Sequence, residues 1–345
     1  MAYEILPAAP DKLIGADGRP AFGNFAGAVP DLNLDAFDFT ALRRPPWTYS
    51  AAAARKLLKR WQFVGVIDDD LVFGAAVVHL HYLSSGFAYV YDRKTGKIVE
   101  GDIKMPLAAN TSFSPSAVAG AGEIRQGAKF IRFDNAIQRG RRTAAASFGD
   151  KLRADFTYDE IGPGVTTSVR QMLYGFNMCY KSAALPAAGT VTVNGQERKL
   201  SPNALALLDW SAGTPPRETI WNWAAAVGRD KKGRALGLNF GCGLNEYSFT
   251  ENTLWRDGAT QMLGGVSFAY DAQNIVGAPW QLTTAAGDVD LTFHPDHERF
   301  EDVNFGLVAS RLHQPFGRFT GAMTFHGEKT AVELYGFCEE HYAKW

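Results

Sequence analysis

The feature that most constrains the fold is a long series of strand-like segments with no helical crossovers between them. From Trp61 onward, runs rich in Val, Ile, Phe and Tyr are separated by turn residues about every 8 to 12 positions, a spacing typical of antiparallel sandwiches and barrels. Parallel sheets need crossover connections, usually helices, and this series has no room for them. Asn194-Gly195 is the strongest hairpin signal, and Gly96 in RKTGK marks a second hairpin end. The chain is therefore predicted to be all-β and antiparallel.

The second half of the sequence repeats the style of the first. Trp61 and Trp221 each precede a strand, a charged turn and a second apolar strand. A length of 345 residues also suffices for two domains. We therefore expect two tandem antiparallel β-barrels or strongly curved sheets. The expected organisation is an N-terminal arm over residues 1–48, a first β-barrel domain over 49–204 and a second over 205–345.

One short helix interrupts this β pattern. Residues 1–48 are rich in Pro and Gly, as in DGRPAFGNF and RRPPW, and favour turns and extended chain. Ser50 is a good N-cap, and AAAARKLLKRW follows it with strong helix formers. The pattern predicts a helix of about ten residues there.

Composition removes several classes of function. Hydrophobic residues make up 46% and charged residues 21%, as in an ordinary folded protein. Lys plus Arg total 35 against 36 for Asp plus Glu, which argues against a nucleic acid partner. Cys179, Cys242 and Cys338 lie far apart and are expected to be reduced. The composition thus indicates an ordinary folded protein for which nucleic acid is an unlikely partner.

The sequence also bears on location. The N-terminus lacks the pattern of a secretory signal, so we expect a cytoplasmic protein. No apolar run approaches the roughly 20 residues of a membrane-spanning helix, although peripheral membrane contact stays open. Nothing in the sequence indicates the oligomeric state.

Two carboxylates are the candidate catalytic groups. In ALALLDW, Asp209 shares a strand face with Leu205 and Leu207, so burial would require a partner or raise its pKa. Glu246 stands beside aromatic residues in NEYSF and could act as the second acid or base. Structural roles remain open for both: a hydrogen bond to a loop amide for Asp209, and an exposed turn position for Glu246.

The stretch Trp221 to Asp257 supplies the candidate binding wall. In LGLNFGCG, strand alternation places Asn239, Gly241 and Gly243 on one face, where a ligand or an aromatic ring could approach the backbone. Sheet curvature is the alternative reason for these glycines. The candidate substrate-binding residues of the stretch are Trp221, Trp223, Asn239, Asn252 and Trp255.

His79 and His81 are two further candidates for substrate binding. Two positions apart on one predicted strand, they would project to the same face, as a metal site on a barrel needs. No spacing in the sequence predicts a third ligand, so our first interpretation has no metal. A metal-dependent enzyme that uses these histidines is kept as an alternative.

Several segments in order also resemble a known family. KRWQF, the stretch from WNWAAAVGRDKKG to TENTLWRDG, QPFGRFTG and the terminal GFCEEHYAKW together resemble the bacterial family called domain of unknown function 2804. The match spans nearly the whole chain. Since the family's name assigns no activity, this resemblance implies no catalytic residues.

A more distant likeness points to a function. Asp209-Trp210 followed by WNW is similar to the acid and W-x-W arrangement of the lipocalin-like group that includes carotenoid hydratases, tocopherol cyclase and Diels-Alderases. The resemblance implies two lipocalin-like barrels that bind an isoprenoid, polyketide or fatty-acyl molecule near their junction. It also implies a hydration, isomerisation or cyclisation without a cofactor. A non-catalytic carrier of hydrophobic ligands is the alternative that the residues leave open.

Overall fold

The computed structural model describes residues 5–42, 50–138, 140–172, 174–306 and 308–345, whose regular structure is nearly all β. The chain divides into two compact units, Pro7–Pro215 and Pro216–Trp345, the second of which also includes the start of the described chain. Each unit holds one antiparallel sheet. The prediction of an all-β protein with two tandem lipocalin-like barrels or strongly curved sheets is confirmed. Residues 1–4 and 43–48 of the predicted arm lie outside the described residues.

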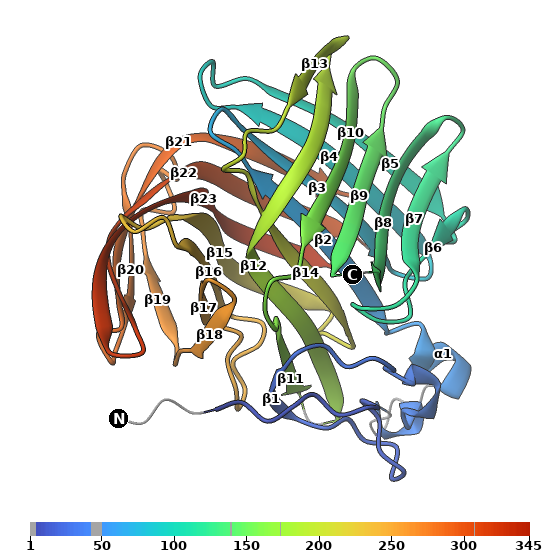
Figure 1. Ribbon diagram of the computed structural model, residues 1–345. Coiled ribbons are helices and arrows are strands. Elements are labelled where there is room, and N and C mark those ends of the chain that lie inside the picture. Colours follow the sequence, from blue (N-terminus) through green and yellow to red (C-terminus); the bar gives the residue numbers. More distant parts are fainter. Residues whose placement is uncertain (1–4, 43–49, 139, 173, 307) are drawn as a thin grey trace. The chain divides into compact units, whose positions relative to one another are not determined.

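The first unit contains a 14-stranded sheet that curls into a nearly closed barrel (Figure 1). Its main path runs β5-β4-β3-β2-β14-β12-β10-β9-β8-β7-β6, while β1 pairs with β11, and β11 and β13 pair with β12. The strands are β1 Gly23–Ala26, β2 Lys59–Ile67, β3 Leu71–His79, β4 Leu83–Asp92, β5 Ile98–Pro106, β6 Thr111–Ser112, β7 Ala121–Gln126, β8 Lys129–Gln138, β9 Arg141–Ser147, β10 Leu152–Asp159, β11 Val165–Gln171, β12 Gly175–Val193, β13 Gln196–Lys199 and β14 Leu205–Gly213.

Alternation of side chains explains how this sheet forms a core. Along β10, Leu152, Ala154, Phe156 and Tyr158 are buried inside the barrel, and the residues between them are more exposed. Inward residues of β2, β3, β4 and β14 belong to the same apolar cluster. These inward side chains together form the apolar core of the barrel.

The long strand β12 connects two parts of the barrel. Its first half pairs with β14, its second half pairs with β10, and the register of the β12–β14 pair shifts between Ser182 and Leu185. Ala184 has a φ of 62° at this bulge. A bulge increases local twist and bends a strand, so one strand serves both parts.

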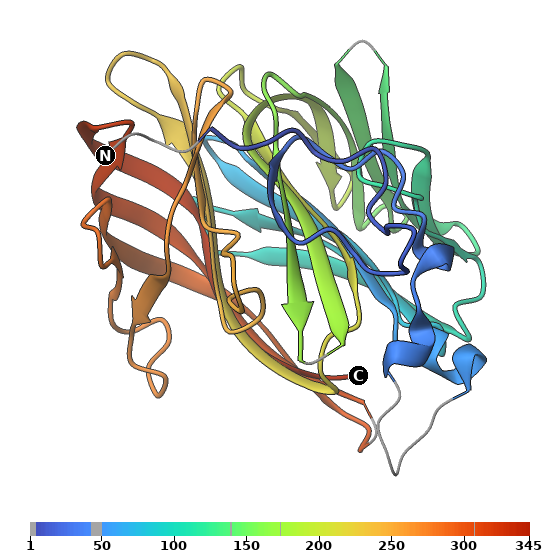
Figure 2. The same ribbon diagram turned by 90° about the horizontal axis from the view of Figure 1, so that it is seen from below.

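A short helical segment precedes β2 and differs from the prediction. It comprises the 3₁₀ turns η1 Leu34–Ala36 and η2 Phe39–Leu42 and the helix α1 Ala51–Arg55, drawn in blue near one another in Figure 2. Ser50 caps α1 as expected, since its side chain accepts a hydrogen bond from the Ala53 amide at 3.2 Å. The predicted length of about ten residues is wrong. Pairing of β2 with β3 and β14 draws the chain from Lys59 onward into the sheet and overrides its helix propensity.

A hydrogen-bonded polar network lies inside the first barrel. Gln62 and Asn135 are fully buried and exchange two side-chain hydrogen bonds, at 2.8 and 2.9 Å. Ser114 accepts a hydrogen bond from the amide of Asn135 and another from the indole of Trp210, both at 2.8 Å. These bonds compensate the cost of burying amide and indole groups.

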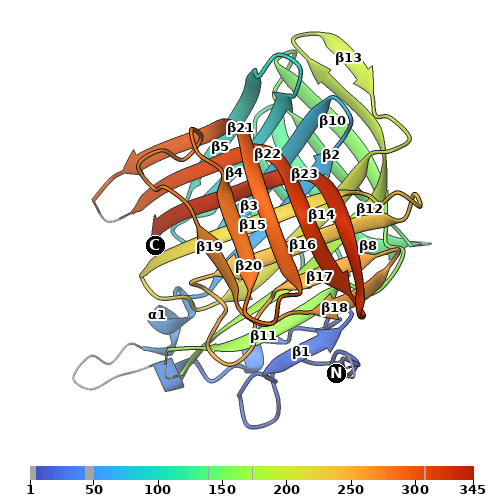
Figure 3. The same cartoon turned by 90° about the vertical axis from the view of Figure 1, so that its left-hand side faces the viewer.

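The second unit contains a nine-stranded sheet that forms a half-barrel, with its strands in yellow, orange and red in Figure 3. The order is β18-β17-β16-β15-β23-β22-β21-β20-β19. The strands are β15 Glu218–Arg229, β16 Ala235–Cys242, β17 Thr253–Arg256, β18 Ala259–Met262, β19 Val266–Ala269, β20 Trp280–Thr284, β21 Val289–Asn304, β22 Ala309–Phe325 and β23 Glu328–Lys344. Its apolar core includes Ala224, Leu238, Phe240, Trp280 and Phe319.

Both hairpins marked in the sequence are present. Asn194 and Gly195 have φ values of 49° and 78° and join β12 to β13, as a two-residue hairpin turn requires. Gly96 has a φ of 71° between β4 and β5. Turn chemistry therefore identified these two positions correctly.

Candidate functional site

A row of polar and aromatic side chains crosses the face of the second sheet opposite its core. Trp223 of β15 pairs with Glu339 of β23, and Trp221 pairs with His341. Ala224 and Cys338, the neighbours that point the other way, belong to the core cluster. These four residues, Trp221, Trp223, Glu339 and His341, are called the tryptophan row below. Glu339 is buried, with only 7% of its surface exposed.

Hydrogen bonds hold the Glu339 carboxylate from two sides. Gln314 of β22 donates to Oε1 at 2.6 Å, and the Trp221 indole lies 3.4 Å from Oε2. The Oε1 atom of Gln314 is itself buried and has no hydrogen-bond partner among the described residues. A buried carboxylate beside aromatic rings and an amide with spare acceptor capacity is a suitable arrangement for holding or moving a proton.

Next to this row, Glu251 lies against the glycine face of β16. A Cβ atom on Gly241 would come within 2.7 Å of Glu251 Oε1, so this glycine admits the carboxylate close to the backbone. Asn245 donates to Glu251 Oε2 at 2.5 Å, and Asn239 lies 3.3 Å from Oε1. Asn239 also accepts a hydrogen bond from the Trp223 indole at 2.7 Å. A glutamate therefore occupies the close approach for which the sequence suggested a ligand or an aromatic ring.

Two other predicted wall residues are also buried. Asn252 accepts from the Gly241 amide at 2.7 Å and donates to the Gly264 carbonyl at 2.9 Å. Trp255 of β17 is 2% exposed, and its indole nitrogen has no partner in the described part of the chain. Asn252 thus links β16 to the loop at Gly264. The indole N–H of Trp255, by contrast, donates no hydrogen bond to a described residue.

His341 extends the row toward β22. Its Nε2 lies 2.9 Å from Ser310 Oγ, and its ring centroid is 4.2 Å from that of Trp221. Burial, with a smaller contribution from the charge of Arg299, lowers the pKa of His341 to about 3. The imidazole is therefore neutral near pH 7.

In the first sheet, Asp209 forms a buried ion pair. Asp209 of β14 lies directly opposite Lys181 of β12, and the Lys181 Nζ to Asp209 Oδ2 distance is 3.1 Å. Both side chains are about nine-tenths buried, on the sheet face opposite the core cluster that contains Leu208 and Trp210. The predicted acid is thus buried and paired with a cation.

Glu246 lies in a different setting. It is exposed in the turn after β16, where its Oε2 accepts a hydrogen bond from the Gly243 amide at 2.6 Å. Burial and the neighbouring Glu246 charge raise the pKa of the Cys242 thiol to about 11. Glu246 therefore has the contacts of a turn-stabilising residue and lacks the buried surroundings of Glu251 and Glu339.

His79 and His81 lie close together, but not on one strand as the sequence predicted. β3 ends at His79, and His81 lies in the following turn with a φ of 67°, so the two do not share a strand. Their ring centroids are nevertheless 4.9 Å apart. Over the described ranges, no group of three or more His, Cys, Asp or Glu side chains could hold a metal ion. The neighbouring charges are those of Arg60 and Lys59, which disfavour a cation.

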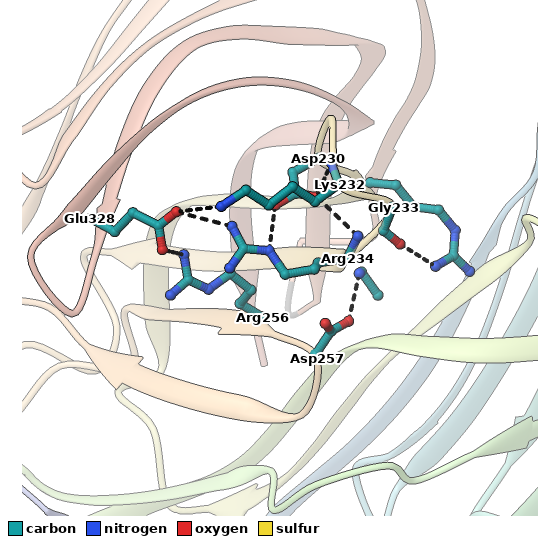
Figure 4. A network of polar contacts seen from close by, with 9 residues as sticks. Asp230, Lys232, Gly233, Arg234, Arg256, Asp257 and Glu328 are labelled. Atoms are coloured by element: carbon teal, nitrogen blue, oxygen red, sulfur yellow. Dashed lines mark hydrogen bonds and ion pairs between the residues drawn. The ribbon is translucent and has the colours of Figure 1, made fainter.

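The other end of the Trp221 to Asp257 stretch is an ionic network (Figure 4). Glu328, the first residue of β23, binds Arg256 at 2.7 Å and Arg234 at 3.2 Å. Arg234 also binds Asp230 at 2.6 Å, and Asp257 accepts from a backbone amide at 2.8 Å. Ion pairs at this end of the stretch therefore link the β15–β16 turn to β17 and to the start of β23. They involve no residue of the tryptophan row.

The sequence interpretation missed several of these groups. Glu339 and His341 lie in GFCEEHYAKW, where strand alternation places them together on the face opposite Cys338. Gln314, which binds Glu339, and Ser310, which binds His341, stand in a different segment, and only the pairing of β22 with β23 brings them close. Lys181 was missed for the same reason, since β12 and β14 are distant in sequence.

Two curved antiparallel sheets with filled cores place the protein in the class of lipocalin-like barrel proteins. The model of the family described as Domain of unknown function (DUF2804) matches residues 7–345, and the chain belongs to this family. No curated protein matches the chain in sequence. Among the described residues, no helix is long and apolar enough to cross a membrane.

Several solved structures share the fold. Kievitone hydratase from Nectria haematococca matches with a TM-score of 0.58 and 14% identity, covering 82% of this chain and 88% of its own. An AttH-like protein from Nitrosomonas europaea matches with a TM-score of 0.55 and 15% identity, covering 82% and 92%. CghA, solved with Sch210972, matches with a TM-score of 0.53 and 12% identity, covering 98% and 97%. At these identities the likeness concerns the fold.

Proposed function

We propose that the chain binds a hydrophobic small molecule against the tryptophan row of the second sheet and acts on it by proton transfer. The observation that carries the proposal is the buried Glu339 carboxylate, bonded to Gln314 and lying beside Trp221 and Trp223. Tryptophan rings supply large apolar contact area, and a carboxyl group in such surroundings is suited to general acid and base catalysis. The similar folds of a hydratase and of CghA, which was solved with a small molecule, support the proposal.

In this scheme the chemistry needs no oxidant. Glu339 or Glu251 donates a proton to the ligand, and the carboxylate that results accepts a proton back in a later step. Hydration, isomerisation and cyclisation can each proceed by these two proton transfers. Positioning of the ligand in a reactive geometry supplies the remaining rate acceleration. Asp209, on the first sheet, is a further candidate acid or base.

The test is to identify the small molecules that accompany the protein from its own cells. Wild type and Glu339→Gln are purified in parallel, and their bound molecules are extracted and compared by mass spectrometry. We expect both to carry an apolar molecule, with the variant accumulating the unreacted form. Hydration would change the mass by one water, whereas isomerisation or cyclisation would change only the retention time.

A matched control is Glu333→Gln, because Glu333 lies on the same strand and is exposed. It should carry the same molecule as the wild type. Absence of any apolar molecule from wild type, and from protein incubated with a cell lipid extract, would exclude the binding proposal.

One observation favours a non-catalytic carrier as the second candidate. Lys181 already pairs with Asp209, which suits a structural role for that acid. If wild type and Glu339→Gln hold the same molecule in the same form, the protein is a carrier.

A further inference from the structure

A second group of polar side chains lies at one end of the first barrel. Arg60 of β2 pairs with His79 of β3, and His79 pairs with Ser84 of β4. Each lies in phase with inward core residues of its own strand, such as Val64, Val77 and Ala88. The three residues therefore form a row on the inner face, referred to below as the Arg60 row, and the His81 ring joins it through His79.

One polar atom of each residue in this row is buried and has no hydrogen-bond partner in the part of the chain that the structure describes. Arg60 Nε, His79 Nδ1, His81 Nε2 and Ser84 Oγ each have almost no exposed surface and no partner among the described residues. Ser84 as a whole is 0% exposed. Buried polar groups are nearly always hydrogen-bonded, and each one left unpaired costs about 1–3 kcal/mol. Four such atoms together indicate a site that another molecule completes.

The charge of the row favours an anion. Arg60 and Lys59 are cationic, and the carboxylate whose charge acts on Arg60 is that of Asp35. Asp35 is exposed and forms its ion pair with Arg55. Burial and the charge of Arg60 lower the pKa of His79, so a neutral imidazole can donate one hydrogen bond without adding repulsion.

The surroundings of the row are apolar. Along the same cross-strand line, Ala212 and Met178 flank Arg60 on one side, and Met105 flanks Ser84 on the other. Ala212 and Met178 are buried in the barrel core, and Met105 packs against it. A ligand at this position would therefore meet hydrogen-bond donors at one point and apolar side chains around it.

We propose that Arg60, His79, His81 and Ser84 bind the carboxylate of a molecule with an apolar body. The guanidinium and the serine hydroxyl donate to the carboxylate oxygens, and the two imidazoles supply further N–H groups. This site uses none of the residues that the proton-transfer proposal uses, and it stands whether or not the chain is an enzyme.

The test compares decanoate with decanol, which has the same chain length and no charge. Calorimetric titration at pH 7 should give a dissociation constant for decanoate at least tenfold below that for decanol. Arg60→Gln should weaken decanoate binding about 10- to 100-fold, as expected for loss of a charged hydrogen bond, and leave decanol unaffected. Equal affinities for the two probes, no binding of decanoate, or no effect of Arg60→Gln would overturn the proposal.

Two controls keep the result specific. Arg153→Gln removes an exposed arginine of the same unit and should not change decanoate binding. Acetate tests the apolar part: if acetate binds as tightly as decanoate, the requirement for an apolar body is overturned. Should Arg60→Gln fail to fold, Ser84→Ala replaces it, with a smaller expected loss. In the wild type, the imidazole ¹⁵N shifts of His79 and His81 should move with decanoate and stay unchanged with decanol.

Discussion

Two polar groups inside the first barrel differ in how their hydrogen bonds are satisfied. In the amide network, Gln62, Asn135, Ser114 and Trp210 bond to one another within the core. In the Arg60 row, which begins two residues before Gln62 on the same strand face, four buried atoms have no partner in the described chain. Burial alone therefore does not distinguish a structural polar group from a binding group.

The difference gives each group a separate expected role. A complete network stabilises the fold, because removing one member leaves the others unpaired. An incomplete row contributes little to stability and is available to a ligand. The predictions below test this contrast, beginning with the largest expected effect.

Asn135→Leu should destabilise the protein most. Loss of the amide leaves Gln62 unpaired and removes a donor from Ser114, at a cost of about 1–3 kcal/mol for each group left unpaired. Arg60→Met should leave the free energy of unfolding unchanged or raise it, because Arg60 Nε is buried without a partner in the described chain and the change removes a half-buried charge. Urea unfolding at pH 7 measures both. A loss for Arg60→Met as large as that for Asn135→Leu would assign the row a structural role.

The second-largest expected difference between the Arg60 row and the amide network is in how stability depends on pH. Burial, followed by the charges of His79 and Arg60, lowers the pKa of His81 from 6.5 to about 4. Below pH 6.5 the His81 imidazole binds a proton more readily in the unfolded chain than in the folded one. The free energy of unfolding is therefore unaffected by His81 above pH 6.5 and decreases as the pH falls towards about 4. The slope of the urea midpoint against pH should be smaller in His81→Gln and unchanged in Asn135→Leu. An unchanged slope in His81→Gln would contradict this account.

The exposed ionic network of the second unit should show the smallest effect. Hydrogen bonds from Arg234 and Arg256 lower the pKa of Glu328 to about 2. Its contribution is therefore present above pH 4.5 and is lost as the pH falls through about 2. Glu328→Gln should lower the thermal midpoint slightly in low salt and have no effect in high salt, since salt screens exposed charges. A shift that persists in high salt would show that packing, and not charge, carries the effect.

The strands and hairpins could be predicted because their signals are local. A few neighbouring residues encode the apolar runs of β2 and β3, the alternation within β10 and the Asn194-Gly195 turn. The helix length was wrong because pairing of β2 with distant strands decides where α1 ends. His81 was misplaced on a strand because nothing local marks the end of β3 at His79.

The candidate site was harder to predict than the fold. Strand alternation alone places Trp221 and Trp223 on one face, as the structure has them. The candidate acid Glu246 is exposed, whereas Glu251, which the sequence analysis did not select, is buried. Which carboxylate is buried depends on how a loop folds over Gly241, and the sequence does not encode this locally. Glu339 joins the row through strand pairing across the sheet.

The Arg60 row also has a bearing on the order of folding. Its members come from β2, β3 and β4, consecutive strands joined by short turns within residues 59–92. The pairing of β2 with β14, by contrast, joins Phe63 to Asp209 and requires a long loop to close. Since local contacts form faster than distant ones, we expect the row to be assembled while the rest of the barrel is still open. A ligand bound at that stage would be enclosed as the chain completes its fold.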